Sequence, residues 1–487
     1  MKKLLLTCSI LILAMFLPAA VHGQTSGTQD SQTPANRFDA GRAQMATADG
    51  AASGAQRNAQ IKKTVERALS ILIPGGIVEG TPRKEKFAAV IDSFSTGQAR
   101  DALEALQKMS AEDANLPPAE VMLAGLTFAV GDQKSGLALL ESSAIKYPQY
   151  PGIFLSFAQI ALNTNRVTDA SLHAAEAARL IDTANLTQEQ KTHFFKQYYQ
   201  VATGVFLRRK QYPEAGKMLE QLQKVAPNRP FYFLTKAEMV FREGNNDAAL
   251  QLLKQHANSI ESKRLPELTL VDWLKNSGKD ESAEQLLART VDQYPGDAQA
   301  RLMTAQMYMA KENFRGALDA LKKFEELNDG ETNQSLDIKG RIAFAGLNYD
   351  IAAGHFRKLV QRAPNDPSSA NILALCLIES KDPEARKQAQ QISQRVAGRM
   401  SGNPLAIASL GYIYLKNGEK EKSAQLMQRV VMTRQGTPEI SWFLANWLAE
   451  NGQKDQAVRL IQQAVDTKGL FLYRTAGRQF LTSLKEQ

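Results

Sequence analysis

The chain has 487 residues, of which 44% are hydrophobic and 22% charged, and its 59 basic and 50 acidic side chains leave a formal net charge of +9. This length is too great for one compact core, and the composition excludes collagen, wholesale disorder and a protein with many membrane spans. A net charge this small over such a length does not by itself indicate nucleic-acid binding.

The first 23 residues have the pattern of a secretory signal peptide. Lys2 and Lys3 precede an apolar run over residues 4–17, and small residues follow up to Gly23. Removal of this segment would leave Gln24 at the N-terminus and a net charge of +7. We therefore expect an exported protein in the periplasm or outside the cell. The alternative is a segment that is retained as a membrane anchor.

Residues 24–60 are rich in Gly, Ser, Thr, Ala, Gln and Asp and contain almost no bulky apolar side chain. Such a segment buries too little surface to offset its ordering entropy, so the sequence predicts a disordered low-complexity linker. Residues 61–82 follow as an N-terminal helix, whose apolar pattern ends at Pro74, Gly75 and Gly76.

Three classes of residue recur with one period between residues 83 and 471. Glycine or asparagine recurs at a distance of 34 residues in three places, between Gly131 and Asn165, Gly244 and Gly278, and Gly418 and Gly452. Small residues follow in the same frame, at Ala102, Gly136, Ala170, Ala215, Ala249, Ala283, Ala317, Ala352, Ala389, Ser423 and Ala457. Prolines recur twelve residues after several of these positions. This agreement predicts a structural repeat.

Each class has a physical role in a pair of antiparallel helices. Apolar residues at helical spacing, such as Leu410 and Tyr414, form one buried stripe. Glycine or asparagine accepts the left-handed backbone of a tight turn, and small residues let two helices approach closely. The longer step before Ala215 predicts a lengthened helix from Thr187 to Arg209, and the register near Ala389 stays open.

The segment Leu410-Gly411-x-x-Tyr414-x-x-x-Gly418 with its partner helix resembles the tetratricopeptide repeat (TPR). The resemblance covers about residues 83–471 as eleven units. It implies an all-α, right-handed superhelical solenoid of antiparallel helix pairs. Residues 472–487 follow as a C-terminal capping helix, which a solenoid needs to cover its last apolar face.

We predict no catalytic, cofactor-binding or metal-binding residues. The histidines that follow the signal segment are His173, His193, His256 and His355. Their spacing matches no metal-binding motif. Cys376 lies within an apolar helix and is interpreted as a buried, inert thiol. The basic run Arg208-Arg209-Lys210 is interpreted as solvated surface.

In the resembled family, the second, fifth, ninth and twelfth positions of each first helix face a ligand in a concave groove. The groove residues that this implies here are Phe241, Met309, Arg341, Phe344, Tyr412, Leu415, Trp442 and Asn446. Trp442 is the expected exposed anchor. The apolar twelfth positions have a second interpretation, which the helical spacing favours: they fill the gaps between helices.

The expected function is an exported scaffold, without catalysis, that binds a protein or peptide in this groove and binds no nucleic acid. A protein of the cell envelope or outer membrane is the expected kind of partner. The alternative is a periplasmic TPR scaffold of a polysaccharide secretion system, with aromatic and acidic residues in the groove. An enzyme would instead present an isolated pocket with converging titratable groups. The partner's identity and the oligomeric state stay open.

Overall fold

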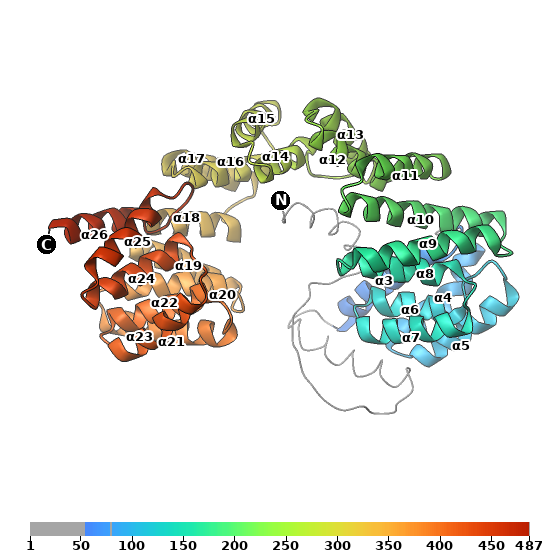
Figure 1. Cartoon of the computed structure of the whole chain (residues 1–487), viewed down its shortest axis with the longest axis horizontal. Coiled ribbons are helices and arrows are strands. Elements are labelled where there is room, and N and C mark those ends of the chain that lie inside the picture. The colour runs from blue at the N-terminus through green and yellow to red at the C-terminus, as the bar shows by residue number, and fades with distance from the viewer. Residues whose placement is uncertain (1–53, 78–79, 487) are drawn as a thin grey trace. The chain divides into compact units, whose positions relative to one another are not determined.

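A computed structural model describes residues 54–77 and 80–486 of the chain. In these ranges the protein consists of 24 α-helices and contains no strand (Figure 1). This confirms the all-α prediction, whereas the right-handed sense of the superhelix stays a prediction. The signal peptide and most of the predicted linker lie outside the described residues. The chain divides into two compact units, the first ending at Gly278 and the second beginning at Lys279.

Unit 1 contains an N-terminal helix, five helix pairs and a last single helix, α14. Its helices are α3 (Gly54–Leu72), α4 (Pro82–Thr96), α5 (Ala99–Glu112), α6 (Ala119–Ala129), α7 (Gln133–Lys146), α8 (Pro151–Asn163), α9 (Val167–Thr183), α10 (Gln188–Arg208), α11 (Tyr212–Val225), α12 (Pro230–Arg242), α13 (Asn246–Ser259) and α14 (Pro266–Asn276). Within this unit α4 packs on α5, α6 on α7, and so on to α12 on α13.

Unit 2 contains a first single helix, α15, five helix pairs and a C-terminal helix. Its helices are α15 (Asp280–Gln293), α16 (Ala298–Ala310), α17 (Phe314–Leu327), α18 (Asn333–Ala345), α19 (Tyr349–Arg362), α20 (Pro367–Ile378), α21 (Pro383–Arg399), α22 (Pro404–Lys416), α23 (Lys420–Met432), α24 (Pro438–Glu450), α25 (Lys454–Asp466) and α26 (Arg474–Glu486). Each unit thus contains five consecutive helix pairs, from α4 to α13 in unit 1 and from α16 to α25 in unit 2.

A residue with left-handed backbone lies in the turn within nine of these ten pairs. The predicted glycine and asparagine positions all have positive φ, for example 60° at Asn165 and 80° at Gly418. Lys210, Glu312 and Leu347 occupy the same position, with φ of 61°, 59° and 61°. The turn geometry therefore requires this conformation even where the residue carries a side chain that disfavours it.

Small residues allow the helices of a pair to approach closely, as predicted. Ala305 and Ala317, which face each other in α16 and α17, are fully buried. In α18 an added Cβ on Gly340 would lie only 2.7 Å from the ring of Phe356 in α19. Larger side chains at these positions would force the two helices apart.

The departures from the repeat length are lengthened helices. α10 has 21 residues and begins with a capping box, in which the Thr187 hydroxyl accepts from the Gln190 N–H at 3.2 Å and the Gln190 side chain accepts from the Thr187 N–H at 3.0 Å. This confirms the predicted long helix. α21 has 17 residues, from Pro383 to Arg399. Its extra length accounts for the longer distance in the sequence between Ala389 and the preceding small residue of the repeat.

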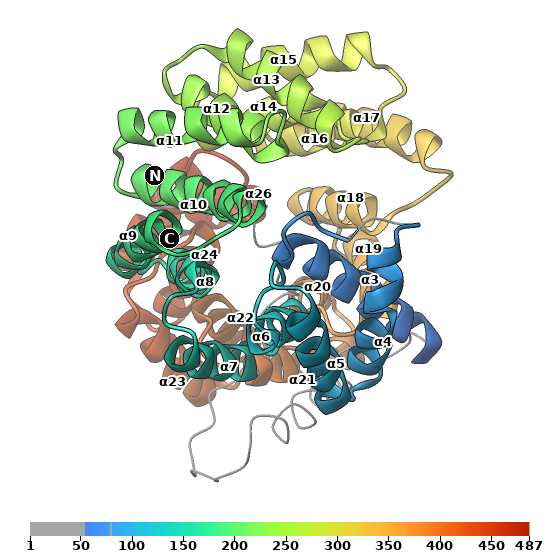
Figure 2. The ribbon, with the colours of Figure 1, turned by 90° about the vertical axis from the view of Figure 1, so that its right-hand side faces the viewer.

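The N-terminal helix begins earlier than predicted. α3 starts at Gly54, so residues 54–60 are helical where the sequence analysis places the end of a disordered linker. These residues contribute no apolar face, but adding turns to an existing helix avoids the cost of nucleation. α3 packs on α4 and on α6 within unit 1, of which Figures 1 and 2 give two views. Among the described helices, none is both long and apolar enough to span a bilayer.

Candidate functional site

Three of the predicted groove residues come together in unit 2, where a C-terminal residue covers them. The Tyr473 ring stacks on Trp442, with 5.2 Å between centroids and 19° between planes. It also meets Phe344 edge-on at 4.9 Å, and its centroid is 6.4 Å from that of Tyr412. Tyr473 is 1% exposed and Trp442 is 6% exposed. The prediction of Trp442 as an exposed anchor is therefore wrong, because the protein's own C-terminal segment occupies this surface.

Polar contacts hold the C-terminal segment in place. The Arg474 guanidinium donates to Glu312 Oε1 at 2.7 Å, and the Phe471 N–H donates to the same oxygen at 3.3 Å. Arg474 also donates to the carbonyls of Thr467 at 2.8 Å and Gly469 at 2.6 Å. Its side chain is only 10% exposed. The turn between α16 and α17, which contains Glu312, is thus tied to the start of α26.

Tyr412 belongs to the same buried cluster. Its hydroxyl donates to Glu379 Oε1 at 2.6 Å, and the Lys416 ammonium lies 3.2 Å from the other oxygen of that carboxylate. Burial, together with the negative charge of Glu379, raises the pKa of Tyr412 well above its usual range. The phenol is therefore a neutral hydrogen-bond donor inside the packing and is not available to a ligand.

Three of the other five predicted groove residues have partners of their own, and the remaining two are half-buried. In unit 1, Phe241 is buried and packs on Trp273 with 5.5 Å between ring centroids. In unit 2, Arg341 pairs with Asp337 at 2.8 Å, and the Asn446 amide donates to the Trp442 carbonyl at 2.8 Å. Met309 and Leu415 are half-buried. For Phe241 and Phe344 the core-packing interpretation is the one that agrees with their burial.

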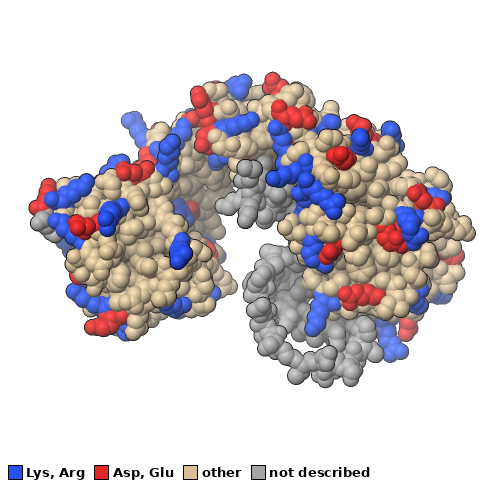
Figure 3. Space-filling view, viewed as in Figure 1, with Lys and Arg blue, Asp and Glu red and all other residues tan. Residues whose placement is uncertain are grey.

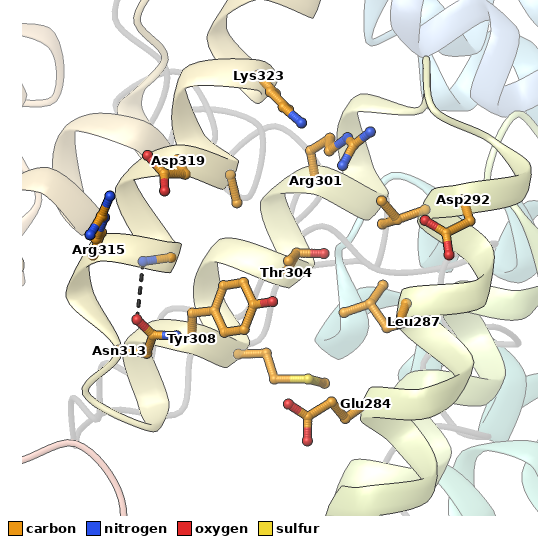
Figure 4. A pocket seen from close by; sticks show the side chains of 15 residues that line it. Glu284, Leu287, Asp292, Arg301, Thr304, Tyr308, Asn313, Arg315, Asp319 and Lys323 are labelled. Carbon is orange, nitrogen blue, oxygen red and sulfur yellow. Dashed lines mark hydrogen bonds between the residues drawn. The ribbon is translucent and has the colours of Figure 1, made fainter.

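A cavity of about 510 Å³ opens between α15, α16 and α17 in unit 2 (Figure 4). Its polar lining consists of Glu284, Asp292, Arg301, Thr304, Tyr308, Asn313, Arg315, Asp319 and Lys323. Figure 4 shows Thr304, Tyr308 and Glu284 facing the same space. Buried apolar residues such as Leu287 form part of the wall. Cationic and acidic groups thus surround an apolar floor, an arrangement that suits a polar peptide segment.

The sequence does not indicate this cavity, because the predicted groove lies on the inner face of first helices. α17 is the second helix of its pair, and the charged residues of α15 and α17 look like ordinary solvated positions. The turn beside the cavity is fixed locally, since Asn313 Oδ1 accepts from the Gly316 N–H at 3.1 Å. Lys311 forms an ion pair with Glu284 at the rim. The lining contains neither histidine nor cysteine.

The remaining titratable groups are dispersed through the packing. Burial, with the nearby charges of Lys196 and Arg229, lowers the pKa of His193 to about 4. Burial raises the pKa of the Cys376 thiol well above its usual range. His256 Nδ1 lies 3.0 Å from the Pro230 carbonyl. Within residues 54–77 and 80–486, no three His, Cys, Asp or Glu side chains are grouped in a way that could hold a metal ion.

Comparison with known proteins gives one family match, over residues 272–331, to the tetratricopeptide repeat. Among solved structures, the chain is similar to a TPR protein from Parabacteroides merdae, with 14% identity over 53% of this chain and 98% of that chain and a TM-score of 0.40. It is also similar to a thermophilic TPR protein from Thermus thermophilus, with 18% identity over 39% and 100% of the two chains and a TM-score of 0.32. For yeast Tom70 the identity is 12%, the coverage 84% and 97%, and the TM-score 0.33. No curated protein matches the sequence.

The matched residues extend from α14 through α17, and helix pairs of the same build precede and follow them along the chain. The left-handed turn and the small residues of close approach recur in these pairs as well. The chain is therefore a multi-repeat helical protein, and its residues 272–331 match the tetratricopeptide repeat.

Proposed function

We propose that this chain is a non-catalytic scaffold that binds other proteins. The observation that supports the proposal is the run of five consecutive helix pairs in each unit, α4 to α13 and α16 to α25, which offers side chains along a repeated helical surface. Repeat proteins of this build bind through many contacts distributed over such a surface. The titratable groups of the described residues with strongly shifted pKa values, such as His193 and Cys376, lie in different helices and do not converge on one pocket.

The cavity between α15, α16 and α17 is the first candidate surface for a partner. Its rim carries both signs of charge, and its floor is apolar, so it suits a segment with polar ends and an apolar side chain. The predicted inner-face residues Phe344, Tyr412 and Trp442 do not provide this surface, since the C-terminal segment covers them. The same burial gives no support to the polysaccharide alternative, which expects exposed aromatic side chains.

Affinity capture from a cell-envelope extract, with the chain from Gln24 as bait, tests the scaffold function. A double variant, Arg301→Glu with Lys323→Glu, should reduce the amount of the captured partner at least about tenfold, because it reverses two cations of the cavity. Lys108→Glu with Lys322→Glu is the matched control, since both side chains are exposed and the change in net charge is the same. If no protein is enriched above the bead control, the scaffold proposal is wrong.

We further propose that the protein is exported to the periplasm or the cell exterior and acts there on an envelope or outer-membrane protein. The support is the signal-peptide pattern of residues 1–23. Cell fractionation and N-terminal sequencing test it, and the expected mature chain begins at Gln24. A chain that keeps Met1 and sediments with membranes would favour the anchor alternative, and a cytoplasmic chain would contradict export.

A further inference from the structure

The positive charge of this protein is concentrated in one part of unit 1. Between Glu189 and Glu238, 48 residues contain nine Lys and Arg and two acidic residues, a net charge of +7, whereas the whole chain carries +9. The other 439 residues therefore contribute +2. The basic stretch comprises most of α10, all of α11 and the first half of α12. Figure 3 shows Lys and Arg side chains gathered near the passage from α10 to α11.

Neighbouring acids do not neutralise these cations. Eight of the nine form no ion pair with any residue in the described part of the chain, and they are Lys191, Lys196, Arg209, Lys210, Lys217, Lys224, Arg229 and Lys236. Directly after this stretch the usual pattern returns, since Arg242 pairs with Glu238. Like charges in one region repel each other and destabilise the compact state, so the arrangement suggests a use outside the fold itself.

The same stretch is rich in aromatic residues, with nine of the 35 Phe, Tyr and Trp of the chain. On α10 the rings of Phe195 and Tyr199 are stacked, with 5.7 Å between centroids and 15° between planes. On α12 the rings of Tyr232 and Phe233 meet at 5.6 Å. All four side chains are half-buried, which leaves part of each ring open to a partner.

Lysines flank these aromatic residues at helical spacing. Lys196 precedes Tyr199 by three residues on α10, and Lys236 follows Tyr232 by four and Phe233 by three on α12, so each lies on the same face of its helix as the ring. Tyr199 and Tyr232 pack at the edge of one apolar cluster that α11 contributes to. Burial, and after it the charges of Lys196 on α10 and of Arg229 at the N-cap of α12, lower the pKa of His193.

We infer that the surface formed by α10, α11 and α12 is an interaction surface for an acidic segment of a partner protein. This inference rests on the proposed scaffold function and names the chemistry of the partner. The cations attract and orient carboxylates, while the aromatic rings offer rigid apolar anchors of the kind that dominate protein interfaces. The cavity between α15, α16 and α17 is a separate surface, because its charges are balanced and its helices belong to unit 2.

A peptide-binding measurement tests this inference on the full mature chain. The probe is a fluorescent peptide of repeated Asp-Glu-Ser-Phe units, and its anisotropy is followed as protein is added. The test variant is Lys196→Glu with Arg229→Glu and Lys236→Glu. The control is Lys108→Glu with Lys322→Glu and Arg459→Glu, three exposed cations outside the surface that give the same change in net charge. Thermal melting of both variants checks that they fold.

The inference predicts that the test variant binds the peptide at least about tenfold more weakly, whereas the control stays within about twofold of the parent. Replacing Phe by Ala in the probe should also weaken binding, because the aromatic anchors lose their partner. Raising the salt concentration from about 50 to about 200 mM should weaken binding to the parent.

Equal losses for the two variants would refute the inference, since they would indicate a response to net charge alone. Tighter binding of single-stranded DNA or heparin than of the peptide, with the same dependence on Lys196, Arg229 and Lys236, would also refute it. Affinity capture with the test variant separates this inference from the proposed function. If the test variant still captures the envelope partner, only this inference fails. If nothing is captured even by the parent chain, the proposed function fails.

Discussion

Truncating Tyr473 to alanine should destabilise unit 2 by about 3–5 kcal/mol. The ring is 1% exposed and contacts Trp442, Phe344 and Phe443, so its removal leaves a cavity in the packing between the C-terminal segment and α18, α22 and α24. The hydroxyl behaves differently, because its oxygen is buried and has no hydrogen-bond partner among the residues that the structure describes. Tyr473→Phe keeps the ring contacts and removes this unsatisfied group, so it should stabilise the unit by about 1 kcal/mol.

Urea unfolding followed by tryptophan fluorescence measures both variants. The chain has three tryptophans, of which Trp442 and Trp447 lie in α24 of unit 2 and Trp273 lies in unit 1. A Trp273→Phe background therefore reports on unit 2 alone, and the shift in midpoint at unchanged slope gives the change in stability. A loss of more than about 1 kcal/mol for Tyr473→Phe would mean that the hydroxyl is hydrogen-bonded, and the reasoning would fail. So would an unchanged midpoint for Tyr473→Ala.

Three further substitutions give distinct expectations. Arg474→Ala should destabilise unit 2 by about 3 kcal/mol, and Glu312→Ala by only about 1–2 kcal/mol. The second loss is smaller because the Arg474 guanidinium keeps its backbone carbonyl acceptors when Glu312 is removed. Urea midpoints that rank the two variants the other way would contradict this. Lys210→Gly should raise the stability of unit 1 by about 1 kcal/mol, because Lys210 has a left-handed backbone with φ of 61° and its side chain is exposed. Thermal melting measures the change, and a lower melting temperature would contradict backbone strain at this residue. His193 has a lowered pKa of about 4, so the folded state binds fewer protons than the unfolded state between that value and the usual 6.5. The stability of unit 1 should therefore fall by up to about 3 kcal/mol as the pH drops from about 6.5 to about 4. In His193→Gln this contribution to the pH dependence should be absent. Urea titrations of the parent and the variant at each pH measure the difference.

The repeat was predictable from the sequence because its signals are local. The conformation of the turn selects glycine or asparagine, and the closest contacts of a helix pair select small residues, so both appear in the sequence at a constant period. Where the turn contains Lys210, Glu312 or Leu347, the same backbone conformation occurs without that signal. The neighbouring helices impose it there, and only the position within the repeat indicates it.

The candidate sites were not predictable in the same way. The groove prediction relied on residue positions within each first helix, which say nothing about what else lies against them. Trp442 and Phe344 occupy such positions, yet Tyr473 covers both. The contact between Arg474 and Glu312 joins residues 162 positions apart, and no periodic pattern encodes it.

The sequence by itself determined that this protein is an array of helical hairpins, because turn conformation and close helix packing are decided within a few tens of residues. The tertiary structure decided which surfaces remain open. Burial depends on the whole set of neighbours around a side chain, including the C-terminal segment that returns to α18, α22 and α24. For the same reason the cavity between α15 and α17 became visible only when residues of three helices were placed around one space.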